Sequence, residues 1–252
     1  MTTPSTFQKY QAPKGLLDDK IILVTGAGDG IGRVAALYYA SFGATVILLG
    51  RTLKKLEAVY DEIENQGNRQ PAIFPMNFEG AAEQDIVSLH DAISEEFGRL
   101  DGILHNAAEL GAQTPISNYA LETWNKLLQV NITAPFMITK ALLPLLSKAD
   151  NASILYTSSS VGHQGKAYWG AYAVSKAAGE NFVQVLADEL DGSSVRVNSI
   201  NPGPVRTGLR AKAYPAEDPA TVALPEAVMP TYLYLMGEDS KSLNGEHINA
   251  QE

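Results

Sequence analysis

The sequence predicts one α/β domain built on a doubly wound parallel sheet of about seven strands, with helices on both faces. Short β-branched runs alternate with helical stretches almost from end to end, which is typical of a parallel sheet with right-handed crossovers. The short runs are nearly continuous in apolar residues, as expected for strands that helices cover on both faces. No repeat, low-complexity tract or linker divides the 252 residues, and this length suits one large α/β domain.

Each element follows from its own stretch of sequence. Seven apolar runs have the length and composition of strands: "KIILVT" (20–25), "TVILL" (45–49), "PAIF" (71–74), "GILH" (102–105), "SILYTS" (153–158), "VRVNSI" (195–200) and "EHIN" (246–249). Six stretches carry apolar residues every three or four positions, as amphipathic helices do: 31–42, 53–66, 80–97, 118–147, 171–190 and 225–236.

The two ends of the domain are expected at residues 16 and 252. The first 15 residues, "MTTPSTFQKYQAPKG", are polar, so we expect a flexible lead-in without the apolar core of a signal peptide. The longest apolar tract, 34–50, is divided by Gly43 and is not expected to cross a membrane. We therefore expect a cytoplasmic protein with no membrane contact.

Composition excludes several kinds of partner. The chain has no cysteine, so disulfides and thiolate metal sites are not expected. A formal net charge of −9 argues against nucleic-acid binding, which depends on clustered Lys and Arg. The four histidines are scattered without ligand-like spacing, so no metal is expected.

Residues 202–224 break the alternation of strands and helices. The segment carries four prolines and no clean period, and a long loop inside a compact domain is usually functional. It follows the sixth predicted strand, at the edge of the sheet where ligands bind in open α/β folds. We expect a substrate lid.

The turn "VTGAGDGIG" (24–32) follows the first predicted strand and opens the first helix. Gly26, Gly30 and Gly32 permit a tight turn, close approach of the backbone to a pyrophosphate, and close helix–sheet packing. The helix N-terminus then offers free N–H groups to phosphates. A flexible strand–helix turn is the alternative, but the position after a strand favours dinucleotide binding.

The second strand ends in "LLGRT", which bears on the choice of dinucleotide. A site for NAD usually places an acid here for the ribose 2′-hydroxyl, whereas an arginine suits a 2′-phosphate. Gly50 stands in the acid's place and Arg51 follows. The sequence therefore favours NADP(H) over NAD(H), although Arg51 could be a solvated surface charge. Lys54 or Lys55 could add to the same phosphate site.

Tyr172 and Lys176 are four residues apart, so on a helix they lie one turn apart on one face. Together with the glycine turn, this pair makes the chain resemble the short-chain dehydrogenase/reductase family over residues 16–250. The stretches "TSSSVGHQG", "WGAY" and "EDP" and the ending "MGEDS…NGEHINAQ" are most similar to the family's bacterial YciK-type oxidoreductases. Further motifs occur in the family's order: "TGAGDGIG", "HNAA" (105–108), Asn131 in "VNIT", Ser159 thirteen residues before Tyr172, and "NPGPVRT" (201–207). The resemblance implies a Rossmann-type fold.

The resemblance also implies a set of cofactor-binding residues. They are Gly26, Asp29, Gly30, Ile31, Gly32, Arg51, Asn77, Asn106, Ala107, Tyr172, Lys176, Pro202, Gly203, Val205 and Thr207. Three residues of this chain depart from the family pattern. His105 and Ala108 replace residues of the family's NNAG motif, and Asn77 stands where the family usually has an aspartate beside the adenine. The C-terminus lacks the family's frequent glycine pair, which weakens any inference about tetramer contacts.

By the same resemblance, the catalytic residues are Asn131, Ser159, Tyr172 and Lys176. A free tyrosine phenol has a pKa near 10, and a nearby ammonium is expected to lower it. Tyr172 would then act as general acid or base, Ser159 would hold the substrate oxygen, Lys176 the nicotinamide ribose, and Asn131 a water that relays protons. Thr207 would contact the nicotinamide-side phosphate, and the backbone near Val205 the carboxamide.

The substrate is less constrained than the chemistry. Ser159, His163, Gln164 and Trp169, with Tyr168, are expected to line a moderately apolar pocket, although an ordinary surface loop is equally consistent with their sequence. Arg206 and Arg210 could meet an acidic substrate group or be solvated lid charges. The sequence therefore predicts an NADP(H)-dependent carbonyl reductase or alcohol dehydrogenase for a small molecule. A 3-oxoacyl-thioester reductase and a non-catalytic NADP(H)-binding sensor or scaffold are the alternatives. A homodimer or homotetramer through 118–147 and 171–190 is expected by resemblance.

Overall fold

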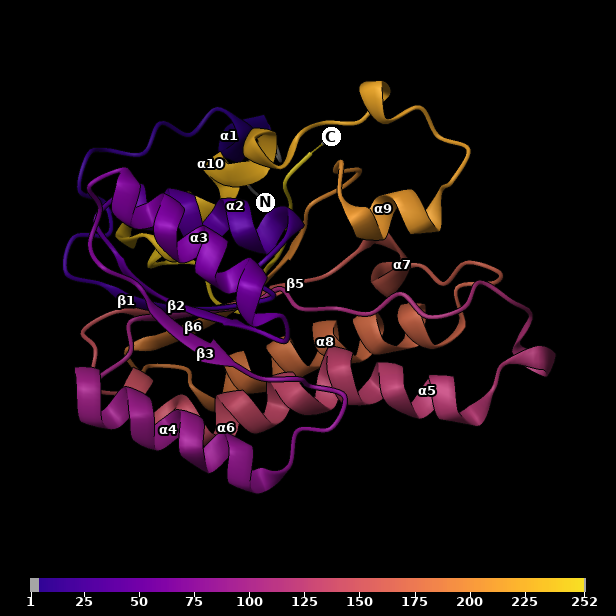
Figure 1. The fold of residues 1–252 in the computed structure, drawn as a ribbon, viewed down its shortest axis with the longest axis horizontal. Coiled ribbons are helices and arrows are strands. Elements are labelled where there is room, and N and C mark those ends of the chain that lie inside the picture. The colour runs from indigo at the N-terminus through magenta and orange to yellow at the C-terminus, as the bar shows by residue number, and fades with distance from the viewer. Residues whose placement is uncertain (1–4, 252) are drawn as a thin grey trace.

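Seven parallel strands form one sheet in the order β3-β2-β1-β4-β5-β6-β7, as expected from the sequence (Figure 1). The computed structural model describes residues 5–251. The strands are β1 Ile21–Thr25, β2 Thr45–Gly50, β3 Ala72–Pro75, β4 Gly102–His105, β5 Ala152–Thr157, β6 Val195–Asn201 and β7 His247–Asn249. The order reverses between β1 and β4, so the crevice for a ligand is expected beside the carboxyl end of β1.

Helices cover both faces of the sheet, one group above it and one below in Figure 1. One face carries α1 Ser5–Gln8, α2 Gly30–Ser41, α3 Leu53–Asn65 and α10 Met229–Met236. The other carries α4 Glu83–Phe97, α6 Ala134–Leu146 and α8 Gly170–Glu189. Successive residues of β1 pack into opposite cores, Ile22 and Val24 into the first and Ile21 and Leu23 into the second. This two-sided burial explains the unbroken apolar runs in the sequence.

The predicted helix 118–147 is instead three segments. The short helix α5 Leu121–Leu128 runs into a π-helical turn at Gln129–Thr133, and α6 follows. A π turn inside a helix often marks a functional position, and this one contains Asn131. Its side chain is bonded to another loop, described below, and this tertiary contact is not visible in a helical periodicity.

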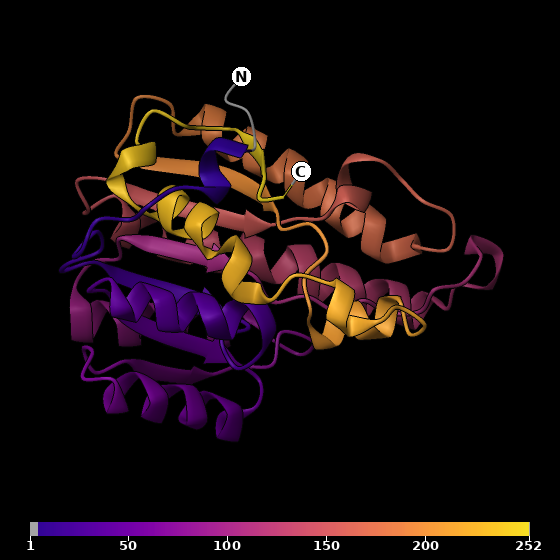
Figure 2. The same ribbon diagram turned by 90° about the horizontal axis from the view of Figure 1, so that it is seen from above.

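The N-terminal segment differs from the flexible lead-in that its polarity predicted. Residues 1–4 lie outside the described part, but the Phe7 ring packs on Tyr234 of α10, with 4.5 Å between ring centroids. Gln8 donates to the Ala250 carbonyl at 2.6 Å, and Tyr10 donates to Asp239 at 2.6 Å. Two aromatic residues three positions apart are enough to dock this short stretch on the domain. Figure 2 shows it beside the C-terminal segment.

Residues 202–224 contain more regular structure than their prolines predicted. Helix α9 Gly208–Ala213 lies within the segment, and Val205 forms an isolated bridge with Ala223. Arg210 makes two hydrogen bonds with Glu217, at 2.6 and 2.7 Å. Helix α9 and the loop after it rise over the carboxyl edge of the sheet in Figure 1.

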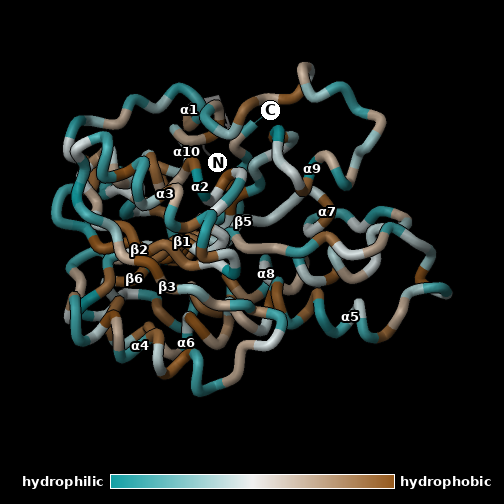
Figure 3. The backbone as a smooth tube through the Cα atoms, in the orientation of Figure 1, coloured by the Kyte–Doolittle hydropathy of each residue, from teal (hydrophilic) through white to brown (hydrophobic). Residues whose placement is uncertain are grey.

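Hydropathy along the backbone matches this layered plan. Figure 3 shows the apolar residues concentrated in the central strands and the polar ones on the outer loops. Within residues 5–251, no helix combines the length and the apolar character needed to span a bilayer.

Candidate active site

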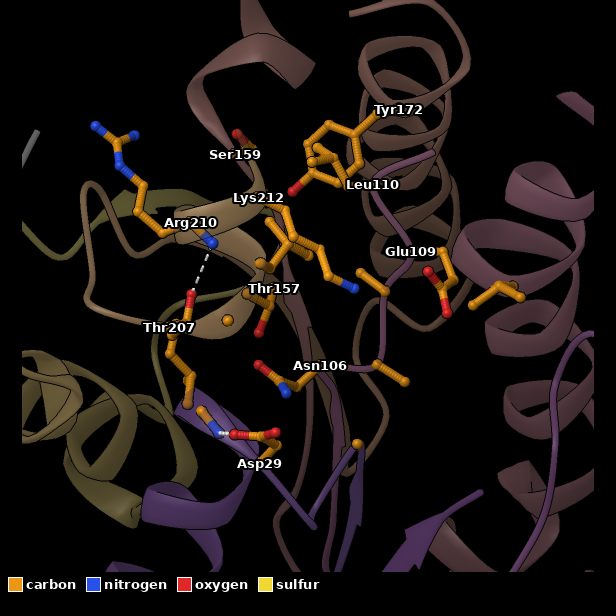
Figure 4. A pocket seen from close by; sticks show the side chains of 18 of the residues that line it. Asp29, Asn106, Glu109, Leu110, Thr157, Ser159, Tyr172, Thr207, Arg210 and Lys212 are labelled. Carbon is orange, nitrogen blue, oxygen red and sulfur yellow. Dashed lines mark hydrogen bonds between the residues drawn. The ribbon is translucent and has the colours of Figure 1, made fainter. Parts of the chain in front are cut away.

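A cleft of about 870 Å³ lies at the carboxyl edge of the sheet (Figure 4). Its walls come from the loops after β1, β2, β3, β4, β5 and β6. Among the predicted cofactor residues, it is lined by Gly26, Asp29, Gly30, Ile31, Arg51, Asn77, Asn106, Ala107, Tyr172, Lys176, Pro202, Gly203, Val205 and Thr207. Of that set, Gly32 is buried behind the lining. The fold therefore brings nearly all of these residues to one cleft.

The glycine turn leaves no room for side chains at Gly26 and Gly32. Gly26 has a φ of +68°, and a side chain there would lie 3.0 Å from the Ala107 Cα. A Cβ on Gly32 would lie 2.3 Å from the Gly26 carbonyl oxygen. Asp29 caps α2 by accepting from the Gly30 N–H. The glycines thus allow a close approach to the backbone at the start of α2, which is the geometry a pyrophosphate needs, while the Asp29 carboxylate occupies the Gly30 N–H.

The turn is supported from β4 and from the segment 202–224. Thr25 accepts hydrogen bonds from the Asn106 and Ala107 N–H groups, at 2.9 and 3.1 Å. On the other side, a Cβ on Gly30 would lie 3.2 Å from the Thr207 methyl group. Thr207 also caps α9, since its hydroxyl accepts from the Arg210 N–H at 3.1 Å. Figure 4 shows both capping bonds, that of Asp29 and that of Thr207, facing the cleft.

The predicted catalytic serine and tyrosine meet across the cleft. Ser159 follows β5 and stands at the N-cap position of the short helix α7 Ser160–His163, where its hydroxyl makes no capping bond, and Tyr172 lies in the first turn of α8. Burial raises the pKa of the Tyr172 phenol to about 12, although a hydrogen bond with Ser159 acts in the opposite direction. The chain's own groups therefore raise the phenol pKa, contrary to the lowering expected from a neighbouring ammonium.

Lys176 explains that difference. Its ammonium donates to the Thr157 carbonyl at 2.7 Å and lies 5.7 Å from the centre of the Tyr172 ring. The side chain is 2% exposed, and burial lowers the pKa of Lys176 to about 7, while the charge of Glu180 raises it. A cation that burial itself disfavours gives the phenolate little support.

Glu180 is a buried carboxylate that the sequence reasoning missed. It lies one turn after Lys176 on α8, and its Oε2 accepts from the Ser199 hydroxyl at 2.9 Å and pairs with His247 Nδ1 at 2.8 Å. Burial tends to raise the pKa of Glu180, but hydrogen bonds with His247, Ser158 and Ser199 and the charge of His247 outweigh it and keep the value below its ordinary one. Its position four residues after Lys176 was the one feature of the sequence that could have indicated Glu180. The sequence does not show that Glu180 is buried.

Asn131 is completely committed to protein groups. Its amide donates to the Glu109 carbonyl at 2.9 Å and to Ser175 at 3.0 Å, and its Oδ1 accepts from the Glu109 N–H at 2.9 Å. Its own main-chain carbonyl accepts from Tyr156. These bonds fix the loop after β4, and Asn131 does not line the cleft. The water relay expected of Asn131 stays a prediction.

Charged residues line the side of the cleft that is formed by the loops after β1, β2 and β4. Arg51 pairs with Glu109 at 2.8 Å, and Lys55 pairs with Asp29 at 2.5 Å. A hydrogen bond from Lys55 is the main cause that lowers the pKa of Asp29. Neither partner of these basic residues was foreseen, because each comes from a different loop.

Only part of the predicted substrate pocket lines the cleft. Trp169 is buried there, with its ring 5.7 Å from those of Tyr172 and Tyr214. His163 and Gln164 are absent from the lining, and the His163 ring stacks on His247 instead. A role for these two residues in substrate binding stays a prediction. Leu110, Ala213 and Tyr214 complete the apolar wall with Trp169.

Two arginines of the segment 202–224 also have protein partners. Arg210 is held by Glu217, and Arg206 donates to the Val222 carbonyl at 3.3 Å. Lys212 of α9, in contrast, extends into the cleft in Figure 4.

Comparison with known proteins identifies a matching family and several similar chains. The family model described as short chain dehydrogenase matches residues 20–218. The oxidoreductase YciK of Escherichia coli K12 is 50% identical over 242 residues, which cover 96% of each chain. A short-chain dehydrogenase structure from Pseudomonas syringae has a TM-score of 0.95 at 52% identity and covers 96% of this chain and 99% of its own. One from Escherichia coli CFT073, complexed with NADPH, has a TM-score of 0.93 at 51% identity, with coverages of 95% and 100%.

Proposed function

Because the chain belongs to the short-chain dehydrogenase family, we propose that it is an NADP(H)-dependent oxidoreductase acting on a carbonyl or secondary-alcohol substrate. The convergence of Ser159, Tyr172 and Lys176 beside the glycine turn, in one cleft, is the observation that carries the proposal. The NADPH complex of a structure 51% identical supports the choice of cofactor.

The residues of the cleft fit a dinucleotide phosphate. The glycine turn and the α2 N-terminus would hold the pyrophosphate, Arg51 the 2′-phosphate and Lys176 the nicotinamide ribose. Asn77, Asn106 and the 202–207 loop would complete the site. When bound there, the nicotinamide supplies or accepts the hydride.

The proton is assigned to the Tyr172 hydroxyl. With a pKa raised to about 12, Tyr172 holds its proton at neutral pH, which is the state a general acid needs in carbonyl reduction. In alcohol oxidation the same oxygen would take the substrate proton. Ser159 would hold the substrate oxygen next to Tyr172, and the apolar wall of Trp169 and Tyr214 would exclude water.

A substrate screen tests this proposal. Ketones, aldehydes and 3-oxoacyl thioesters would be offered with NADPH, whose absorbance falls on oxidation. Thioester-only turnover would identify the alternative reductase. The turnover of the Tyr172→Phe variant should be at least about a thousandfold lower than that of the wild type, because the variant can neither transfer the proton nor orient the substrate. NADPH should still bind to it.

Two outcomes would contradict the assignment. Unchanged turnover in Tyr172→Phe would remove Tyr172 as acid or base. NADPH binding without turnover of any offered class in the wild type would favour the sensor or scaffold function over an enzyme.

The oligomer expected from the resemblance becomes part of the proposal. Phe136 of α6 and Val174 and Val185 of α8 expose 47%, 45% and 49% of their surface, and these are the helices named for a homodimer or homotetramer. Light scattering of the purified chain measures the assembled mass directly.

A further inference from the structure

The end of β2 lacks the acid that commonly holds the ribose 2′-hydroxyl of NAD, and the side chain of Arg51, which follows β2, extends to a carboxylate on another loop. Glu109 follows β4, and its Oε1 accepts from Arg51 Nη1 at 2.8 Å. β1 lies between β2 and β4 in the sheet, so the ion pair spans the width of that strand. Both residues line the cleft.

The position of Glu109 is fixed by its main chain. Its N–H and its carbonyl are both bonded to the Asn131 side chain, at 2.9 Å each, and Asn131 is fully buried. The Glu109 side chain is 28% exposed and that of Arg51 is 60% exposed. The carboxylate is therefore the anchored partner, and Arg51 is the one that extends from the rim.

The two side chains favour different dinucleotides. A guanidinium binds a phosphate dianion, and its five N–H donors leave room for a phosphate beside the bond to Glu109. A carboxylate accepts a hydrogen bond from a ribose hydroxyl but repels a phosphate placed on the same guanidinium. Lys126 pairs with Glu79 at 2.7 Å, and its charge also acts on Glu109, so it offsets part of the charge of that carboxylate.

We propose that Glu109 is a specificity-determining residue that supplies the missing acid at the adenosine ribose, which lets the cleft accept NAD(H) as well as NADP(H). Arg51 favours the 2′-phosphate, and Glu109 restrains that preference. This inference rests on the proposed function, because it concerns the cofactor of that same site.

Dissociation constants for NADPH and NADH test the proposal without any substrate. Calorimetric titration, or quenching of Trp169 in the cleft, would give the NADH-to-NADPH ratio of dissociation constants for each variant. Glu109→Gln keeps the size of the side chain and the main-chain bonds to Asn131. We expect this variant to raise the ratio at least about fivefold, because NADPH binds more tightly and NADH more weakly.

The controls separate charge from position. Glu57→Gln removes the same charge from an exposed position of α3 and leaves Lys126 paired with Glu79, so its ratio should stay within about twofold of the wild type. Glu109→Ala should change the ratio in the same direction as Glu109→Gln. Thermal unfolding of each variant alone shows whether the fold is kept.

Glu109→Gln and Arg51→Gln decide different questions. A ratio in Glu109→Gln that is unchanged or lower than in the wild type overturns the role of Glu109, whatever Arg51→Gln does. Arg51→Gln should lower the ratio about tenfold by weakening NADPH. If it leaves the ratio unchanged, the NADP(H) preference in the proposed function is what fails.

Discussion

At the scale of single residues, burial decides the charge of the groups around Tyr172. Lys176 is held at a pKa of about 7, against an ordinary 10.5, and Tyr172 at about 12. Both shifts have burial as their main cause and both disfavour the charged form. Burial therefore keeps the Tyr172 phenol in its protonated form.

Lys176 should leave a signature in the pH dependence of stability. Between pH about 7 and 10.5 the unfolded chain carries a proton at Lys176 that the folded chain lacks. Stability contributed by this residue therefore rises with pH across that window. Urea unfolding at several pH values should show a less positive slope in Lys176→Met than in the wild type.

A lysine at the surface provides the control. Lys241 is exposed, and Lys241→Met should keep the wild-type slope. Equal slopes in all three proteins would mean that Lys176 keeps its ordinary pKa in the folded chain.

The residues that sequence reasoning found differ in kind from those that it missed. Tyr172 and Lys176 were predictable because four positions on a helix fix their relative placement. Glu109 and Glu180 were missed, since their roles depend on contacts with Arg51 and His247 from distant parts of the chain. Periodicity carries no information about such contacts.

At the scale of elements, strands were predicted better than the breaks in helices. All seven strands lie within one or two residues of their predicted bounds, because burial on both faces leaves an unbroken apolar run. The π turn at Gln129–Thr133 and the helix α9 were not predicted. A π turn keeps a helical composition, and α9 is too short to show a period.

The β1–α2 turn is too crowded to accept a side chain at Gly32. A side chain at Gly32 would collide with the Gly26 carbonyl at 2.3 Å, and main-chain atoms cannot move aside cheaply. Gly32→Ala should lower the free energy of unfolding by about 2–4 kcal/mol and abolish detectable NADPH binding. Urea unfolding and calorimetric titration measure the two effects.

Gly165 offers a matched substitution. Nothing lies within 4 Å of a Cβ built there, and its φ is not positive. Gly165→Ala should therefore leave both stability and NADPH binding close to wild type. A Gly32→Ala protein that behaves like Gly165→Ala would show that the turn is less crowded than the structure indicates.

At the scale of the whole molecule, the cleft joins segments from most of the chain. Its lining runs from Gly26 to Tyr214 and includes loops from both halves of the sheet. A ligand held by all of them must be released before the sheet can unfold, so binding and global stability are coupled.

Saturating NADPH should accordingly raise the melting temperature. A concentration of one hundred times the dissociation constant adds about 2.7 kcal/mol, or about 5–10 °C for a domain of this size. Differential scanning fluorimetry measures the shift, with inorganic pyrophosphate as the control for anions. A shift no larger with NADPH than with pyrophosphate would contradict binding across the whole cleft.

The two bonds between Arg210 and Glu217 tie α9 to the loop that follows it. If the segment opens, we therefore expect it to move as one rigid body that is hinged near Pro202 and Ala223. We do not expect its residues to move independently of one another. Since the chain has no cysteine, a single fluorophore on a cysteine introduced at Ala216 would be the only label. The signal from that one dye would track the whole segment.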